Sequence, residues 1–361
     1  MSAPKKIPLL HVLFSGQGGL GTYFMNFVEA DKQGRFEHHA FFYGILPLEP
    51  EYRQFCEDRG IAYTYQPHGG KLDRKAYKAC HRFAKKYDVS LVLLHTMSLT
   101  PFYLRLGRKY QVYAIDHTSH QFKTKVEWVL TALNYRFADR FIYFYQDQLA
   151  HARAHLIWPK QPKRPALVPK TVDTASFVPA RPPADGVFKL GMTSRLTAGK
   201  RHELLIEAMA LIEEAEANIY LYLAGEGANK KMLEARAKEL GVQDRVHFVG
   251  QLNKPGLISF YQSLDAYIHA TNSETICYSI MEAQACGLPV LASDVSGVNT
   301  VITSGKHGLL FKNEAASVKE AIIKLNESPE LKATASRTNR KEAETLDKSG
   351  NPVEKIYNLL T

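Results

Sequence analysis

Short apolar runs alternate with helical stretches twice along this chain, and a proline-rich segment separates the two series. The first series comprises residues 9–15, 39–43, 61–65, 90–95, 111–116, 140–145 and 166–169, and the second comprises 188–193, 219–224, 245–249, 266–270 and 290–292. Such strands, separated by helices, are typical of parallel sheets that are covered on both faces. The pattern predicts an α/β protein with two Rossmann-like domains that face one another across a cleft.

The chain length agrees with this division, since one core rarely extends beyond about 250–300 residues and the chain has 361. Pro179, Pro182, Pro183 and Gly186 mark the break. We expect the first domain over residues 1–180, the second over 187–345 and a C-terminal helix within 346–361. In such sheets ligands bind beyond the carboxyl ends of the strands, so the residues that follow each run are the candidates for a site.

The composition excludes several classes of protein. Apolar residues make up 45% and charged residues 23%, which are ordinary globular values. The four cysteines have neither disulfide-framework nor zinc-site spacing and indicate buried thiols in a reducing compartment. No apolar run approaches the 18 or so residues of a membrane span, and the chain has no Walker loop, no G-x-S-x-G elbow and no Asp-x-Asp. His151 and His155 lack the Glu of a metalloprotease helix and are expected on the surface.

Two glutamates, Glu274 and Glu282, stand eight residues apart between two apolar runs. Glu274 is expected in the loop after the run 264–270, and Glu282 on the helix that follows. The beginning of that helix offers free N–H groups and the positive end of the helix dipole, which favour a phosphate. One ligand could therefore touch both carboxylates, with a diphosphate between them.

This segment resembles the E-x7-E signature of retaining glycosyltransferases with the GT-B fold, in particular family 4, which uses nucleotide sugars. The resemblance implies that Glu274 lies by the donor sugar and that Glu282 accepts hydrogen bonds from the ribose hydroxyls. Backbone N–H groups near Ile276, Cys277 and Tyr278 would then stabilise the departing phosphate. The family usually has Gly at the position of Cys277, and Cys lacks the freedom of Gly at positive φ.

Residues 191–201 follow a predicted strand and carry Arg195 and Lys200 five residues apart. They resemble the family element in which both cations grip the donor diphosphate. An Arg offers a bidentate fork and a Lys a compact point charge, so the pair suits this task. We expect Arg195 and Lys200 to bind the donor and to act in catalysis.

The first domain contributes weaker signals. Residues 16–21 read Gly-Gln-Gly-Gly-Leu-Gly, but no acidic residue ends the second strand to hold a dinucleotide ribose. Gly18 and Gly19 leave room for a donor diphosphate or an acceptor. His117 ends the fifth strand and resembles the family histidine beside the donor sugar, which makes it a candidate catalytic contact. Lys170-Thr171 departs from the Asn-Gly that the family commonly has before Val-Asp.

The positive charge of the chain is concentrated in its first half. The net charge is +10, and residues 1–186 hold 26 Lys and Arg against 15 Asp and Glu. A stretch with helical spacing predicts a basic surface, either simply solvated or in contact with anionic lipid; its members are Lys71, Arg74, Lys75, Lys78, Arg82, Lys85 and Lys86. No basic-aromatic module of a nucleic-acid-binding type is present.

The sequence therefore predicts a retaining, metal-independent glycosyltransferase that moves a sugar from a nucleotide sugar to a glycan or lipid-linked acceptor, in cell-surface polysaccharide or glycolipid synthesis. Family frequency favours a UDP-sugar over a GDP-sugar, and the resemblance implies that the C-terminal helix packs on the first domain. The expected location is cytoplasmic, with peripheral contact to the membrane left open. The alternatives are a sugar-nucleotide epimerase or a glycan phosphorylase on the same fold, and a non-catalytic membrane-associated scaffold.

Overall fold

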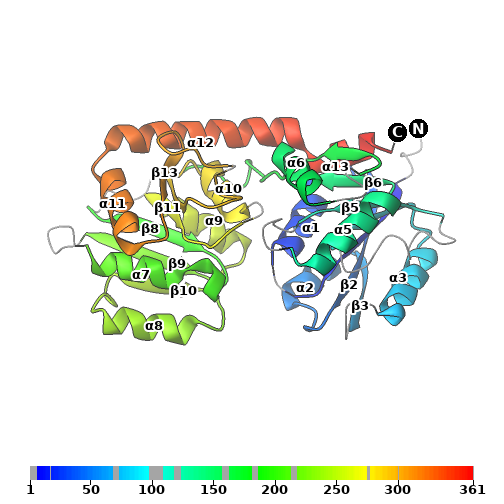
Figure 1. The fold of residues 1–361 in the computed structure, drawn as a ribbon, viewed down its shortest axis with the longest axis horizontal. Coiled ribbons are helices and arrows are strands. Elements are labelled where there is room, and N and C mark those ends of the chain that lie inside the picture. Colours follow the sequence, from blue (N-terminus) through cyan, green and yellow to red (C-terminus); the bar gives the residue numbers. More distant parts are fainter. Residues whose placement is uncertain are drawn as a thin grey trace. The chain divides into compact units, whose positions relative to one another are not determined.

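The computed structural model describes residues 6–16, 18–67, 73–96, 109–117, 123–156, 162–180, 186–212, 218–274, 277–299 and 301–360. The chain forms two compact units. The first unit combines Met1–Lys170 with Gly350–Thr361, and the second is Thr171–Ser349. In each unit a sheet is flanked by helices (Figure 1).

The first unit contains a parallel sheet of seven strands in the order β3-β2-β1-β4-β5-β6-β7. These strands are β1 (Ile7–Phe14), β2 (Phe36–Gly44), β3 (Ala62–Pro67), β4 (Leu91–Leu94), β5 (Gln111–Ile115), β6 (Arg140–Tyr143) and β7 (Pro165–Leu167). The helices are α1 (Gly19–Ala30), α2 (Pro50–Asp58), α3 (Arg74–Lys86), α5 (Lys125–Phe137), α6 (Gln146–His155) and α13 (Pro352–Asn358). The central strands are largely apolar because helices cover both faces of the sheet.

Alternate residues of β1 pack on opposite faces of this sheet, as the two-residue period of a strand requires. Leu10 and Val12 pack in a cluster with α3, whereas Leu13 packs in a cluster with α1 and α2. The side chain of Asp73 accepts hydrogen bonds from the N–H groups of Lys75 and Ala76, so α3 begins at Arg74.

The second unit contains a parallel sheet of six strands in the order β10-β9-β8-β11-β12-β13. These strands are β8 (Phe188–Thr193), β9 (Ile219–Ala224), β10 (Val246–Gly250), β11 (Ala266–His269), β12 (Val290–Ser293) and β13 (Gly308–Phe311). The helices are η2 (Ala198–Lys200), α7 (His202–Ala210), α8 (Lys230–Glu239), α9 (Lys254–Gln262), α10 (Tyr278–Ala285), α11 (Ala315–Asn326) and α12 (Pro329–Gly350). The pattern of two Rossmann-like sheets is confirmed, and β13 is a strand that it did not predict.

The unit boundary lies at Lys170, so residues 171–180 belong to the second unit rather than to the first domain as predicted from the sequence. The C-terminal segment is helical over Pro352–Asn358, and α13 contacts α1 within the first unit. The Glu354 side chain also pairs with Arg35 at 3.4 Å.

In both sheets the strand order reverses at one place, between β1 and β4 and between β8 and β11. Ligands of doubly wound sheets bind at this reversal, beyond the carboxyl ends of the strands. The glycine-rich loop follows β1, the loop with Arg195 and Lys200 follows β8, and Glu274 follows β11. The topology therefore brings the predicted site residues of each unit to the position where that unit can bind a ligand.

Candidate functional site

The loops after β8 and β11 are joined by hydrogen bonds. The N–H of Asn272 donates to the carbonyl oxygen of Gly199 at 3.1 Å, and the hydroxyl of Thr271 donates to the same oxygen at 3.3 Å. These strands are neighbours in the sheet, so the residues that follow them meet at one edge. The contacts fix the loop of Lys200 against the loop of Glu274.

Lys200 and Glu274 form an ion pair through Nζ and Oε1. The same oxygen lies 2.9 Å from Nε2 of His269, at the end of β11. Burial by itself raises the pKa of Glu274, but the hydrogen bond from His269 and the charge of Lys200 lower it to about 2. Glu274 is therefore a carboxylate at neutral pH, and it shares the site with a cation that can bind a phosphate.

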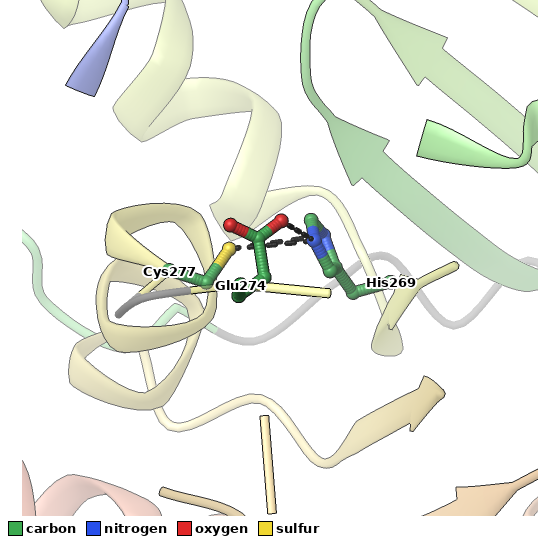
Figure 2. Close-up of side chains that lie close together, drawn as sticks. All are labelled: His269, Glu274 and Cys277. Carbon is green, nitrogen blue, oxygen red and sulfur yellow. Dashed lines mark hydrogen bonds and ion pairs between the residues drawn. The ribbon is translucent and has the colours of Figure 1, made fainter. Parts of the chain in front are cut away.

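His269, Glu274 and Cys277 point toward one another (Figure 2). The thiol of Cys277 lies 3.5 Å from Nε2 of His269, and the Tyr267 hydroxyl lies 3.2 Å from its Nδ1. Burial opposes the charge on His269, but Cys277 and Glu274 outweigh it and raise the pKa of His269 to about 9. Burial raises the pKa of the Cys277 thiol, yet the neighbouring His269 brings it below its ordinary value.

This cluster also has the donor atoms of a metal site. One nitrogen of His269, one oxygen of Glu274 and the sulfur of Cys277 lie within 4.8 Å of one another. Such a mixed set suits Zn²⁺. The Lys200 ammonium already occupies Oε1 of Glu274 and opposes a second cation there.

Glu282 lies inside the second unit on α10, and it is buried, with 7% exposure. Its Oε2 accepts a hydrogen bond of 2.8 Å from the Tyr261 hydroxyl, which lies 2.8 Å from Oγ1 of Thr193. Burial raises the pKa of Glu282 to about 7, although the hydrogen bond from Tyr261 lowers it. The carboxyl therefore has a mixed protonation state near neutral pH.

The helix α10 begins at Tyr278, with Cys277 as its N-cap. The Cys277 side chain does not cap the first N–H groups of the helix. The backbone of Cys277 has φ −90° and ψ 106°, an extended conformation that any residue adopts. The departure from Gly at this position therefore causes no backbone strain. Ile276, the other predicted phosphate contact, lies outside the described residues.

Arg195 follows β8 and its side chain is exposed. In the described part of the chain, its guanidinium makes no ion pair, unlike Lys200. Gly227 packs directly against this loop, so a Cβ at Gly227 would collide with the backbone of Leu196. The structure thus brings Lys200 to Glu274 and leaves Arg195 open to a ligand.

In the first unit, Gly18 is the N-cap of α1 and Gly19 begins it, and a Cβ at either would meet no atom within 4 Å. His117 lies just after β5, and its Nε2 lies 3.2 Å from Nδ1 of His95. Burial, the charge of Lys170 and the neighbouring His95 hold the pKa of His117 well below its ordinary value. The imidazole is therefore neutral.

The basic surface is carried by α3. Its described members are all exposed: Arg74, Lys75, Lys78, Arg82, Lys85 and Lys86. Lys71 lies outside the described residues. The opposite side of α3 packs into the core through Ala76, Tyr77 and Cys80.

Residues 177–342 match the family model of glycosyl transferases group 1. Over 98% of the chain, the fold superposes on the structure of Anabaena Alr3699/HepE in complex with UDP-glucose, with a TM-score of 0.81, 18% identity and 99% of that chain covered. It also superposes on WaaG, a glycosyltransferase involved in lipopolysaccharide biosynthesis, with a TM-score of 0.72 and 19% identity over 98% and 100% of the two chains. The chain has the GT-B fold and resembles glycosyltransferase family 4.

One relative of this GT-B chain matches over most of both sequences. It is the lipopolysaccharide core biosynthesis glycosyltransferase LpsD of Rhizobium meliloti, 24% identical over 340 residues, which are 90% of this chain and 89% of LpsD. Other curated relatives match over a shorter part. The alpha-monoglucosyldiacylglycerol synthase of Streptococcus pneumoniae is 30% identical over 142 residues, which are 38% of this chain and 32% of the synthase. The chain spans 32% to 46% of the length of several further relatives.

Sequence reasoning missed several residues of this GT-B site. His269 and Tyr261 hold the two glutamates, and neither belongs to a motif. His269 lies within the predicted strand 266–270, and a polar His within an apolar run is the signal that could have identified it as a site residue.

The four cysteines are buried and free, and His151 and His155 are exposed, as expected. Among the described residues, no helix has the length and apolar character needed to cross a membrane.

Proposed function

We propose that this chain is a retaining glycosyltransferase that takes a sugar from a nucleotide sugar. The observation that carries the proposal is the ion pair of Lys200 and Glu274 beside the beginning of α10. A cation, a permanent carboxylate and the positive end of a helix at one sheet edge suit a sugar attached to a diphosphate. Retention is inferred from the E-x7-E resemblance.

Each residue then has a chemical task. Lys200, Arg195 and the N–H groups at the start of α10 stabilise the negative charge that develops on the departing phosphate. Glu274 stays ionised, so it accepts hydrogen bonds from sugar hydroxyls and orients the donor. Glu282 accepts hydrogen bonds from the ribose hydroxyls in its ionised form. The acceptor hydroxyl attacks on the face that the nucleotide leaves.

We further propose that the reaction needs no metal ion. The Lys200 ammonium supplies positive charge at the carboxylate where a divalent ion would otherwise bind. The three donor atoms of His269, Glu274 and Cys277 are those of a metal site, but the Lys200 ammonium on Glu274 opposes a second cation there. Unchanged transfer after treatment with a chelator is the expected result.

A UDP-sugar is the favoured donor, and a glycan or lipid-linked acceptor the favoured partner. The donor proposal is supported by the solved complexes of HepE with UDP and with UDP-glucose. The acceptor proposal is supported by LpsD, a lipopolysaccharide core biosynthesis glycosyltransferase. The exposed basic side of α3 would contact an anionic membrane surface, with each cation contributing up to about 1 kcal/mol.

The test is thermal stabilisation by UDP, GDP, ADP and NAD, with Glu282→Ala and Arg195→Ala beside the wild-type protein. We expect a shift from one nucleoside diphosphate that chelator leaves unchanged and both substitutions remove. No shift from any diphosphate, or a shift that both variants retain, would contradict the proposal. Conversion of a nucleotide sugar to its epimer with no acceptor requirement would favour the epimerase.

Membrane contact has its own test, sedimentation with anionic phospholipid vesicles. The variant combines Arg74→Glu, Lys78→Glu and Lys85→Glu, at three exposed positions of α3. Binding that falls in this variant and with rising salt supports the contact. Equal sedimentation of variant and wild-type protein contradicts it.

A further inference from the structure

Four imidazoles and one carboxylate form a continuous chain of side-chain hydrogen bonds through the first unit. We call it the histidine relay; its members are Asp31, His38, His11, His95 and His117. The successive distances are 3.1 Å from Asp31 Oδ2 to His38 Nε2, 3.1 Å from His38 Nδ1 to His11 Nε2, 3.1 Å from His11 Nδ1 to His95 Nε2 and 3.2 Å from His95 Nδ1 to His117 Nε2.

The relay crosses the sheet on the side covered by α1. Asp31 is the C-cap of α1, and the ring of His11 contacts Phe24 and Phe27 of that helix edge-on. His38 lies near the start of β2 and His95 just after β4, so the chain of bonds runs toward the carboxyl ends of the strands. It ends at His117, the proposed contact of the donor sugar.

The inner links of the relay are buried. His11 is fully buried, and His95 is 1% exposed. Burial and the neighbouring imidazoles hold the pKa of His11 well below its ordinary value, and burial lowers that of His95 to about 3. Neutral imidazoles carry one N–H each, so each can donate one hydrogen bond and accept one.

Asp31 sets the direction of all the bonds. Burial raises its pKa, but hydrogen bonds from His38 and from the backbone N–H groups of Phe36 and Arg35 lower it below the ordinary value. A carboxylate only accepts, so His38 donates from Nε2, and with a single proton on its ring it accepts at Nδ1. The same condition then passes to each following imidazole.

We propose that the relay fixes His117 in one tautomer. If the hydrogen bonds ran outward from the carboxylate, Nε2 of His117 would accept a hydrogen bond from His95. If they run inward, toward the carboxylate, Nε2 of His117 donates a hydrogen bond to His95. Since His38 donates toward Asp31, every bond runs inward, so His117 carries its proton on Nε2 and donates it to His95. The other four members are positioning residues, since they act on the site only through His117. Nδ1 of His117 is then an acceptor.

The inference rests on the proposed function, because that function gives this acceptor a use. A sugar hydroxyl can donate a hydrogen bond, and in this tautomer Nδ1 of His117 can accept a hydrogen bond but cannot donate one. In the opposite tautomer the ring would offer an N–H at the same atom. The relay therefore decides which partner the ring of His117 can bind.

Other charged and titratable groups surround the far end of the relay. The Lys170 ammonium lies 4.7 Å from the centre of the Phe144 ring, and its charge lowers the pKa of His117. The ring of Tyr23, from α1, meets those of His95 and His117 edge-on at 5.4 and 5.0 Å. Near the other end, His39 also lowers the pKa of His11. The charge of Lys170 disfavours a cation at the His117 end of the relay, which keeps one direction of bonding.

The first test reads the tautomer directly, by ¹⁵N NMR of the histidine rings in the full-length protein. His117→Gln assigns its signals. We expect wild-type His117 to be protonated on Nε2 alone. In Asp31→Asn the amide can donate as well as accept, so both directions are allowed and His117 should show a mixture of tautomers. His11→Phe interrupts the relay without a polar group and should also change the signals.

The matched control is His39→Phe. His39 is the neighbour of His38 on β2, is 3% exposed and takes no part in the relay. Asp31→Asn should lower kcat for sugar transfer about fivefold to thirtyfold, the effect of one misdirected hydrogen bond, and leave the Kd for UDP unchanged. His39→Phe should leave kcat and the His117 tautomer unchanged at a similar melting temperature.

A wild-type His117 protonated on Nδ1, or one tautomer retained in both Asp31→Asn and His11→Phe, would overturn the proposal. If kcat fell in proportion to the melting temperature, and fell equally in His39→Phe, the relay would have only a structural role. This result would also overturn the proposal. A failure of the proposed function would be observed differently. The wild-type protein would then turn over no nucleotide sugar, while the ring-nitrogen signals would still show the tautomer of His117.

Discussion

The Tyr261 hydroxyl donates a hydrogen bond of 2.8 Å to Oε2 of Glu282, inside the second unit. This bond partly compensates the burial of a carboxyl that is 7% exposed. Burial nevertheless prevails and raises the pKa of Glu282 to about 7. A residue proposed to accept hydrogen bonds from ribose is thus only partly ionised at neutral pH without ligand. Ligand binding should favour its ionised form.

The raised pKa of Glu282 predicts a contribution to stability that falls with rising pH. The folded state holds this proton more tightly than the unfolded state, so between pH 4.5 and about 7 the group contributes progressively less stability. The loss across that window is up to about 3 kcal/mol. Glu282→Gln keeps an acceptor for Tyr261 and should remove this part of the pH dependence. Urea unfolding across this pH range measures it, and parallel curves for variant and wild-type protein would refute the expected pKa.

Lys200 should contribute strongly to diphosphate binding. Lys200→Met removes the cation beside Glu274, and we expect the Kd for UDP to rise about 10- to 150-fold, as for the loss of a charged hydrogen bond. The pKa of Glu274 should rise from about 2 at the same time, since its ion pair is lost. Lys230→Met is the control, because Lys230, the first residue of α8, also forms an ion pair, with Glu226 at 2.7 Å. Calorimetry that finds equal Kd values for the two variants would contradict this role.

The sequence predicts the sheets well because most of their strands are buried on both faces. The apolar runs correspond to β1 through β12. The last strand, Gly308–Phe311, was missed, because it follows the turn at Gly305 and itself begins with a glycine at positive φ. The residue at which α3 begins is set by its N-cap, Asp73, so the helical spacing of apolar residues does not predict it.

The candidate site was predictable only where a motif lies in one loop. Glu274 and Lys200 come from loops after neighbouring strands, and the strand order alone brings such loops together. Their partners come from tertiary contacts. His269 contacts Glu274 across five residues, whereas Tyr261 contacts Glu282 across 21. The histidine relay joins residues of four strands or strand ends, so no local pattern could reveal it.

Gly297 should be essential for the position of Glu274. Its φ is +86°, and a Cβ there would collide with the carbonyl oxygen of Glu274. Gly297→Ala should cost at least about 2 kcal/mol and weaken UDP binding, because strain and overlap both act on one loop. Gly199→Ala is the control, since a Cβ at Gly199 meets no atom within 4 Å. Chemical unfolding and UDP titration of both variants test this, and an unaffected Gly297→Ala would show that the loop adapts freely.

Cys277 should be replaceable without loss of nucleotide binding, although family 4 usually has Gly at this position. The φ of −90° at Cys277 needs no glycine, and its thiol lies 3.0 Å from the Ser279 hydroxyl and 3.5 Å from His269. Cys277→Gly should therefore lower the free energy of unfolding by about 1 kcal/mol or more, through added chain entropy and lost packing. Its Kd for UDP should stay within about twofold, because the N–H groups at the start of α10 remain in place.

Cys277→Ser separates packing from backbone freedom in this prediction, since it keeps a hydrogen-bonding group and the restricted backbone. Its stability should lie between those of the wild-type protein and Cys277→Gly. The pKa of His269 should also fall from about 9 in both variants, because a thiol with a lowered pKa is a main cause of its elevation. Tighter UDP binding by Cys277→Gly alone would mean that the loop must adopt a positive φ with ligand, which the extended backbone at Cys277 argues against.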